Sequence, residues 1–189
     1  MKEADLVEVV RQAVFLQRVA QPDIEYTLLL PSTEISFDGD ARLVSQALTN
    51  ILKNAAEGIE GKVGAVDSVN RIETSVILDG EMISIIITDN GRGLPRADRR
   101  RLTEPYMTTR AKGTGLGLAI VKKIMEDHGG TLELSDAPSD EGWESGARIV
   151  LCFPRVGVLS NDEDQVAGGA DKADGLSVVA SKVEATDGV

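Results

Sequence analysis

The 189-residue sequence has one cysteine, few aromatic residues and no long apolar run. Its single cysteine, Cys152, excludes internal disulfides, and the apolar residues around it predict a buried free thiol. Only 3% of the residues are aromatic, so the core must be built from aliphatic side chains. No stretch approaches the about 20 apolar residues that span a bilayer, and residues 1–5 do not resemble a signal peptide. These absences predict a soluble cytoplasmic chain without direct membrane contact.

An excess of positive charge is also lacking. Lys and Arg total 20 against 31 Asp and Glu, which gives a net charge of −11 and argues against a nucleic-acid partner. A local basic site for a small anion stays possible, because residues 90–113 hold seven bases. These bases are Arg92, Arg96, Arg99, Arg100, Arg101, Arg110 and Lys112.

Apolar periodicity divides the chain into alternating helices and strands. Helices are expected over 4–19, 40–59 and 116–127, and strands over 24–30, 34–37, 72–78, 82–88, 131–134 and 147–153. The Asp79-Gly80 pair predicts a hairpin between two of the strands. This order predicts an α+β fold, a two-layer α/β sandwich whose mixed, mostly antiparallel sheet is covered by helices on one face.

Three segments follow from this organisation. Residues 1–20 are expected to form an N-terminal helix, and residues 21–154 the main domain. Residues 155–189 contain no aromatic residue and are rich in acids, Gly, Ala and Ser, which predicts a disordered tail. The polar connection over 90–115 is long for a compact domain, and such connections are usually functional.

The helix over 40–59 carries Asn50, Asn54 and Glu57 on one stripe, because they are four and three residues apart. Asn is a poor helix former, so two on one stripe need a reason. Their amide oxygens suit Mg²⁺, which prefers oxygen ligands and shares them with phosphate. The alternative is a solvated polar edge.

Two glycine-containing motifs follow the hairpin. Asp89 ends a strand before Asn-Gly-Arg-Gly, where a carboxylate could accept a hydrogen bond from an exocyclic amine and Gly91 and Gly93 could admit a flat ring. The alternative is an ordinary turn. Residues 113–117, Gly-Thr-Gly-Leu-Gly, open the next helix, where backbone amides can bind phosphate. The chain has neither a P-loop nor a dinucleotide fingerprint.

These motifs together resemble the ATP-binding catalytic domain of bacterial sensor histidine kinases, a superfamily shared with gyrase, Hsp90 and MutL. Residues 50–56 resemble its N box, 89–94 its G1 box and 113–119 its G2 box. Residues 103–110 resemble its F-box region, with Thr and Tyr where phenylalanines are usual. The resemblance covers 24–154, and the phrase over 104–130 is most similar to NtrY-type nitrogen-regulation sensor kinases.

The resemblance implies a Bergerat-type fold, a lid over about 94–114, and ATP and Mg²⁺ as cofactors. Asn54 is implied as the metal ligand, and Asn54, Arg110 and Asn50 as the catalytic residues. The implied nucleotide-binding set is Asn50, Asn54, Glu57, Asp89, Gly91, Gly93, Thr109, Lys112, Gly113, Thr114, Gly115, Leu116, Gly117 and Leu118. Asp89 would read the adenine, and many relatives have Lys at the position of Glu57.

The only histidine, His128, stands at a helix end before two glycines, which favours a structural role. The resemblance therefore implies transfer of the γ-phosphoryl group to a histidine on a dimerisation module absent from this chain. A response regulator would be the downstream partner, and the parent protein could be an inner-membrane sensor. The alternative is a nucleotide-binding regulatory module without phosphotransfer. A MutL- or gyrase-like ATPase is disfavoured, because Asn50 replaces the general-base glutamate of such hydrolases.

Overall fold

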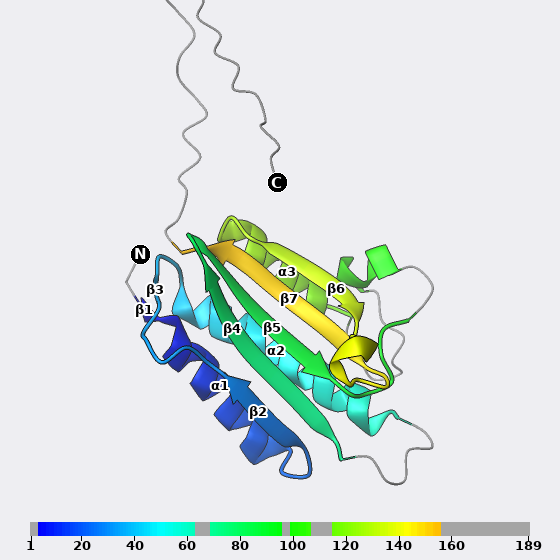
Figure 1. Ribbon diagram of the computed structural model, residues 1–189. Helices are drawn as coiled ribbons and strands as arrows, with labels where there is room; N and C mark the ends of the chain where they lie inside the picture. Colours follow the sequence, from blue (N-terminus) through cyan, green and yellow to red (C-terminus); the bar gives the residue numbers. More distant parts are fainter. Residues whose placement is uncertain (1–3, 63–68, 96–98, 107–114, 156–189) are drawn as a thin grey trace, which may run out of the picture. The chain divides into compact units, whose positions relative to one another are not determined.

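The computed structural model describes residues 4–62, 69–95, 99–106 and 115–155 of the chain (Figure 1). The expected tail from residue 156 onward and most of the expected lid lie outside these residues. In chain order the elements are β1 (Ala4–Asp5), α1 (Leu6–Ala20), β2 (Glu25–Leu29), β3 (Ser36–Phe37), α2 (Ala41–Glu60), β4 (Arg71–Asp79), β5 (Met82–Asp89), the 3-10 helix η1 (Arg99–Thr103), α3 (Gly117–Asp127), β6 (Thr131–Asp136), the 3-10 helix η2 (Ser139–Glu141) and β7 (Ala147–Pro154).

Five strands form the main sheet, in the order β2-β4-β5-β7-β6. β2 runs parallel to β4, and every other neighbouring pair is antiparallel. The register pairs Asp79 with Met82 and Ile72 with Asp89, so the predicted β4–β5 hairpin is confirmed. β1 and β3 form a separate two-stranded pair.

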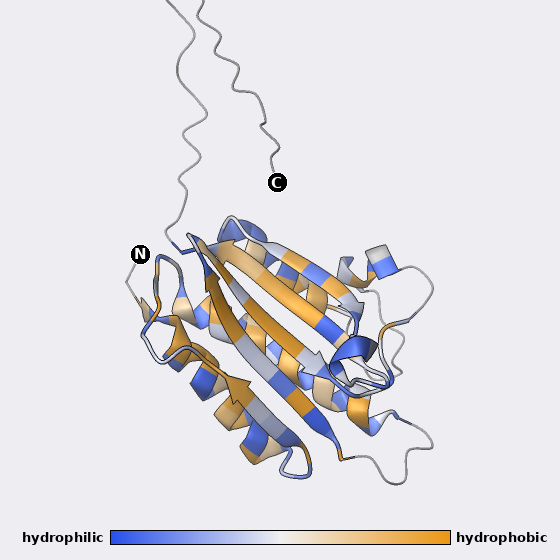
Figure 2. Ribbon diagram, viewed as in Figure 1, coloured by the Kyte–Doolittle hydropathy of each residue, from blue (hydrophilic) through white to orange (hydrophobic). Residues whose placement is uncertain are grey.

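The three α-helices cover one face of this sheet (Figure 1). Side chains alternate between buried and partly exposed along β7, as expected for a sheet with one covered face. Figure 2 shows that β5 and β7, which lie inside the sheet, are mostly apolar. The predicted α+β two-layer architecture is therefore confirmed.

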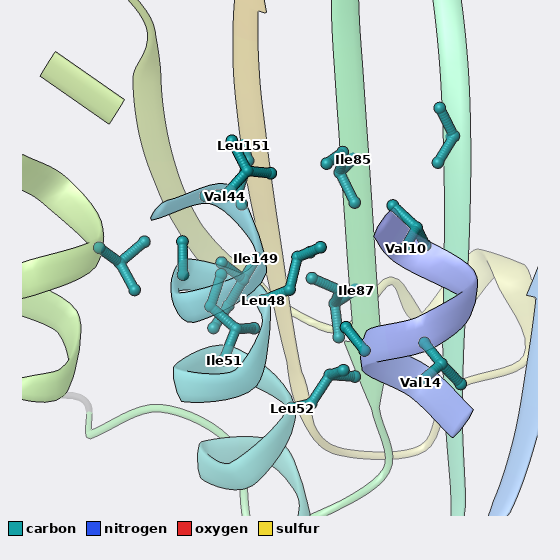
Figure 3. Close-up of a cluster of buried hydrophobic side chains, with 14 of the residues drawn as sticks. Val10, Val14, Val44, Leu48, Ile51, Leu52, Ile85, Ile87, Ile149 and Leu151 are labelled. Atoms are coloured by element: carbon teal, nitrogen blue, oxygen red, sulfur yellow. The ribbon is translucent and has the colours of Figure 1, made fainter. Parts of the chain in front are cut away.

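The core lies between the three helices and the sheet and is almost entirely aliphatic (Figure 3). α1 contributes Val10 and Val14, and α2 contributes Leu48 and Leu52, all at most 1% exposed. Burying a side chain of this size contributes about 1.5–3 kcal/mol. Fully buried strand residues that face these helices include Ile85, Ile87 and Leu151.

Both long helices begin at an aspartate. The Asp5 carboxylate accepts from the amide of Val7 at the start of α1, and the Asp40 carboxylate accepts from the amide of Arg42 at the start of α2. The same Arg42 guanidinium also donates to Asp40, and these hydrogen bonds hold the pKa of Asp40 below its usual range. Asp40, the first residue of the helix expected over 40–59, is therefore the N-cap of α2.

The expectation of a buried thiol is corrected. Cys152 is partly exposed, because the alternation along β7 places it on the face opposite the helices. Two arginines of the basic segment form ion pairs with acids. Arg99 donates to both carboxylate oxygens of Asp136 at 2.6 and 2.8 Å. Arg101 pairs with Glu104 at 3.2 Å. Within the described ranges, no helix has the length and apolar character to cross a membrane.

Candidate functional site

α2 carries the predicted polar stripe. Asn50, Asn54 and Glu57 are all partly buried, at the edge of the apolar face of this helix. The Asn50 Nδ2 atom is buried and has no hydrogen-bond partner among the described residues. Lys53 lies one turn before Glu57, with its Nζ 4.0 Å from Glu57 Oε1.

Asp89 ends β5 and is only 4% exposed. Its Oδ1 accepts a hydrogen bond from the amide of Gly91 at 2.8 Å and a longer one from the amide of Ala147 at 3.4 Å. A buried carboxylate needs such donors to offset the loss of water. The two amides come from different segments, so they fix the direction in which the carboxylate points.

The turn after Asp89 lies directly on α2. A Cβ on Gly91 would be 2.5 Å from the carbonyl carbon of Gly58, so this close approach of two backbones requires glycine. The amide of Arg92 then donates to the carbonyl oxygen of Gly58 at 3.1 Å. Gly93 has a φ of 77°, in the left-handed region that glycine favours.

The N-terminus of α3 approaches the same side of α2. Leu116 is the N-cap residue and makes no side-chain capping hydrogen bond, and Gly115 before it has a φ of 68°. A Cβ on Gly117 would lie 3.7 Å from Asn54 Nδ2, so the first turn of α3 packs beside the Asn54 carboxamide. Leu118 follows in this turn and is partly buried. The first amides of a helix without a side-chain cap are a suitable place for an anion.

α2 therefore brings the two halves of the predicted site together. A Cβ on Gly58 would lie 3.9 Å from Asp89 Oδ1, while Asn54 lies beside Gly117. Asn54 and Gly58 are four residues apart on one helix face, a separation of about 6 Å along the axis. The carboxylate and the N-terminus of α3 thus meet adjacent turns of one helix.

Some predicted site residues lie outside the described residues. These are Thr109, Arg110, Lys112, Gly113 and Thr114. Of the described part of the chain, no three His, Cys, Asp or Glu side chains gather as a metal site. The oxygen donors present on the stripe are the carboxamides of Asn50 and Asn54 and the carboxylate of Glu57.

Sequence reasoning missed residues that support Asp89 from outside the three motifs. Gly146 has a φ of 127°, and a Cβ there would collide with the carbonyl oxygen of Asp89. The carbonyl oxygen of Gly58 accepts a hydrogen bond from the Arg92 amide, in the turn after Asp89. A glycine inside a well-formed helix pattern, as at Gly58, was the one available signal of a close backbone approach.

His128 is structural, as predicted. Its Nδ1 donates to the carbonyl oxygen of Ile124 at 2.7 Å, and its Nε2 accepts from the amide of Asp40 at 3.0 Å. A carbonyl can only accept, which places the proton on Nδ1. The ring therefore joins the end of α3 to the start of α2.

Comparison with known proteins identifies the family. Residues 39–157 match the family described as histidine kinase-, DNA gyrase B- and HSP90-like ATPase. The chain is 55% identical over 138 residues to the nitrogen regulation protein NtrY of Azorhizobium caulinodans, covering 73% of this chain and 18% of that protein. It is 36% identical over 138 residues to a sensor histidine kinase of Rickettsia conorii described as NtrY-like, covering 73% of this chain and 22% of that protein.

Among solved structures, the mycobacterial sensor histidine kinase MprB superposes with a TM-score of 0.70 at 27% identity, covering 83% of this chain and 99% of that one. The chain spans about a fifth of the length of the curated relatives it matches. The family match covers more than half of the chain and includes the α2 stripe, Asp89 and the start of α3. The chain belongs to the family of histidine kinase-, DNA gyrase B- and HSP90-like ATPases, as an ATP-binding catalytic domain of the sensor histidine kinase type.

Proposed function

We propose that this chain binds Mg²⁺-ATP between α2, the turn after Asp89 and the start of α3. In the whole protein it would transfer the γ-phosphoryl group to a histidine on a dimerisation module. The observation that carries this proposal is the meeting of a buried carboxylate and a helix N-terminus on adjacent turns of α2. A nucleotide needs both features, one for the base and one for the phosphates.

Asp89 is proposed to recognise the adenine. A carboxylate accepts hydrogen bonds and cannot donate them, so it matches the exocyclic amine of adenine and opposes the carbonyl group of guanine. Hydrogen bonds from the amides of Gly91 and Ala147 hold the carboxylate before any ligand binds. Such preorganisation favours selective binding. Gly91 and Gly93 would form the wall on which the base lies.

Asn54 is proposed as the magnesium ligand. Its carboxamide oxygen is a hard donor of the kind that Mg²⁺ binds, and its side chain lies next to the start of α3. A neutral amide is a weak donor alone, which fits an ion that arrives with the nucleotide and keeps phosphate and water ligands. The bound ion would neutralise charge on the phosphates. Asn50 and Glu57 would support this stripe.

The phosphates are proposed to lie at the first amides of α3. Gly115 and Gly117 leave the backbone accessible there, with Leu116 and Leu118 beside them. The remaining predicted contacts, Thr109, Arg110, Lys112, Gly113 and Thr114, belong to the proposed lid over about 94–114. A guanidinium and an ammonium close to the phosphates would stabilise charge during transfer.

Transfer rather than hydrolysis is proposed because Asn50 stands where hydrolase relatives carry a glutamate. An amide cannot take a proton from water at neutral pH. His128 is a poor acceptor within the chain, since both of its ring nitrogens are engaged. The acceptor would be a separate histidine, and a response regulator in a cytoplasmic phosphorelay would receive the group. The likeness to NtrY suggests nitrogen regulation as the pathway.

The proposal is tested by incubating the chain with γ-labelled ATP and Mg²⁺, alone and with the histidine-bearing helix pair of the parent protein. We expect acid-labile label on the helix pair and none on this chain. Replacing the acceptor histidine of the helix pair by glutamine is the matched control. Label on His128, or binding of ATP without label on the helix pair, would contradict the proposed transfer.

A further inference from the structure

A contact between Arg71 and Trp143 lies outside the motifs of the family. Trp143 is in the loop between β6 and β7, is 4% exposed and is the only tryptophan of the chain. The Arg71 Cζ atom lies 4.0 Å from the centre of its ring, and Arg71 Nη2 donates to the carbonyl oxygen of Gly142 at 2.8 Å. A cation over a buried indole is favourable, and the hydrogen bond adds a fixed direction. Arg71 therefore holds this loop to the start of β4.

The backbone of Arg71 is bonded to Asn90, the residue after Asp89. The Arg71 amide donates to Asn90 Oδ1 at 2.9 Å, and Asn90 Nδ2 donates to the carbonyl oxygen of Val69 at 2.7 Å. Asn90, whose side chain makes both bonds, is itself only 8% exposed. The side chain of Asn90 thus fastens the start of β4 to the end of β5.

The C-terminal end of the β6–β7 loop lies against Asp89. The amide of Ala137 donates to the carbonyl oxygen of Gly146, which closes the base of the loop. Gly146 lies against the Asp89 backbone so closely that a Cβ would collide with it. The next amide, that of Ala147, donates to Asp89 Oδ1. Asp89 is therefore held from one side by the turn and from the other by the loop that Trp143 anchors.

We infer that Arg71 and Trp143 form a clamp that positions the Asp89 carboxylate, with Arg71 and Trp143 as positioning residues for base selectivity. Arg71 contacts the loop through its guanidinium, and its backbone amide donates to Asn90 in the turn, so this residue joins the two segments. Loss of the guanidinium would release the loop from the start of β4, and the Ala147 amide would move away from Asp89 Oδ1. The clamp concerns the free protein, but its consequence for the base rests on the proposed function.

The test compares Arg71→Met, which keeps length and loses charge, with Arg71→Lys, which keeps a cation over the ring. Phe153→Leu is the matched control, because Phe153 is buried at the opposite end of β7, in edge contact with Phe37. Amide hydrogen exchange at Gly91 and Ala147 is measured without nucleotide, and affinities for Mg²⁺-ATP and Mg²⁺-GTP by calorimetry.

We expect exchange at Gly91 and Ala147 to be about tenfold faster in Arg71→Met and close to wild type in Arg71→Lys and Phe153→Leu. The ratio of ATP to GTP affinity should fall about tenfold in Arg71→Met alone. Unchanged exchange in Arg71→Met, or equal acceleration in Phe153→Leu, would overturn the clamp. If exchange is faster in Arg71→Met but the wild-type chain binds no ATP, the clamp is supported and the proposed function is refuted.

Discussion

At the scale of single residues, two glycines of the site differ in whether a larger side chain would fit. Gly91 has no room for one, whereas Gly58 has. Gly91 lies against the backbone of α2, where a Cβ would be 2.5 Å from a carbonyl carbon that cannot move aside. Gly58 is inside α2, and among the described residues the nearest atom to a Cβ there would be Asp89 Oδ1 at 3.9 Å. The sequence alone marks both as glycines and does not distinguish them, because the distinction depends on which backbone approaches.

We predict that Gly91→Ala destabilises the fold by about 1–3 kcal/mol through overpacking. Gly58→Ala should instead stabilise it by about 0.5–1 kcal/mol, because alanine loses less backbone entropy in a helix. Urea unfolding of both variants measures the difference. Equal stability of the two variants would contradict the close packing of the turn on α2.

Asn54 provides a second prediction at this scale. Asn54→Ala removes the proposed magnesium ligand, so the affinity for ATP in Mg²⁺ should fall about tenfold, while the affinity in EDTA should change little. Calorimetry under the two conditions measures both. Gln46→Ala, a change at an exposed position earlier on α2, is the control. An unchanged affinity of Asn54→Ala in Mg²⁺ would remove this residue from the site.

At the scale of elements, local patterns predicted most of the structure. The Asp79-Gly80 pair predicted the hairpin, and Asp40 marked the start of α2. The spacing of apolar residues predicted which face of α2 is buried. The β1–β3 pair was not predicted, because two-residue strands carry too little pattern to indicate a partner. The ion pair of Arg99 with Asp136 was also missed, since it joins residues 37 positions apart.

The link between α3 and α2 gives a prediction for His128. His128→Leu leaves the Asp40 amide without its acceptor and should cost about 1–3 kcal/mol of stability. Nucleotide affinity should change little, because the link lies at the end of α3 remote from Gly117. Thermal unfolding and calorimetry measure the two effects, with Lys122→Ala on the exposed side of α3 as control. A stable His128→Leu variant with weakened ATP binding would reverse this assignment.

At the scale of the whole molecule, the fold class was predictable and the sheet order was not. Mixed helices and strands indicated a two-layer α+β fold, but nothing local places β7 between β5 and β6 or makes β2 parallel to β4. The same holds for the site. The motifs gave Asp89 and Asn54, whereas the support from Gly146 and Trp143 depends on where the β6–β7 loop returns.

We expect the folded unit to select its nucleotide through the Asp89 carboxylate. Asn at position 89 could still offer an oxygen to the Gly91 amide, but it would present an amine where the carboxylate met the amine of adenine. Asp89→Asn should therefore weaken Mg²⁺-ATP binding about tenfold and reduce the preference over Mg²⁺-GTP.

Calorimetric titration of the wild-type chain and of Asp89→Asn with both nucleotides measures this selection. We expect saturable heat with Mg²⁺-ATP for the wild type and a lower ratio of ATP to GTP affinity for Asp89→Asn. No binding of Mg²⁺-ATP by the folded wild-type chain, or an identical ratio in the variant, would contradict it.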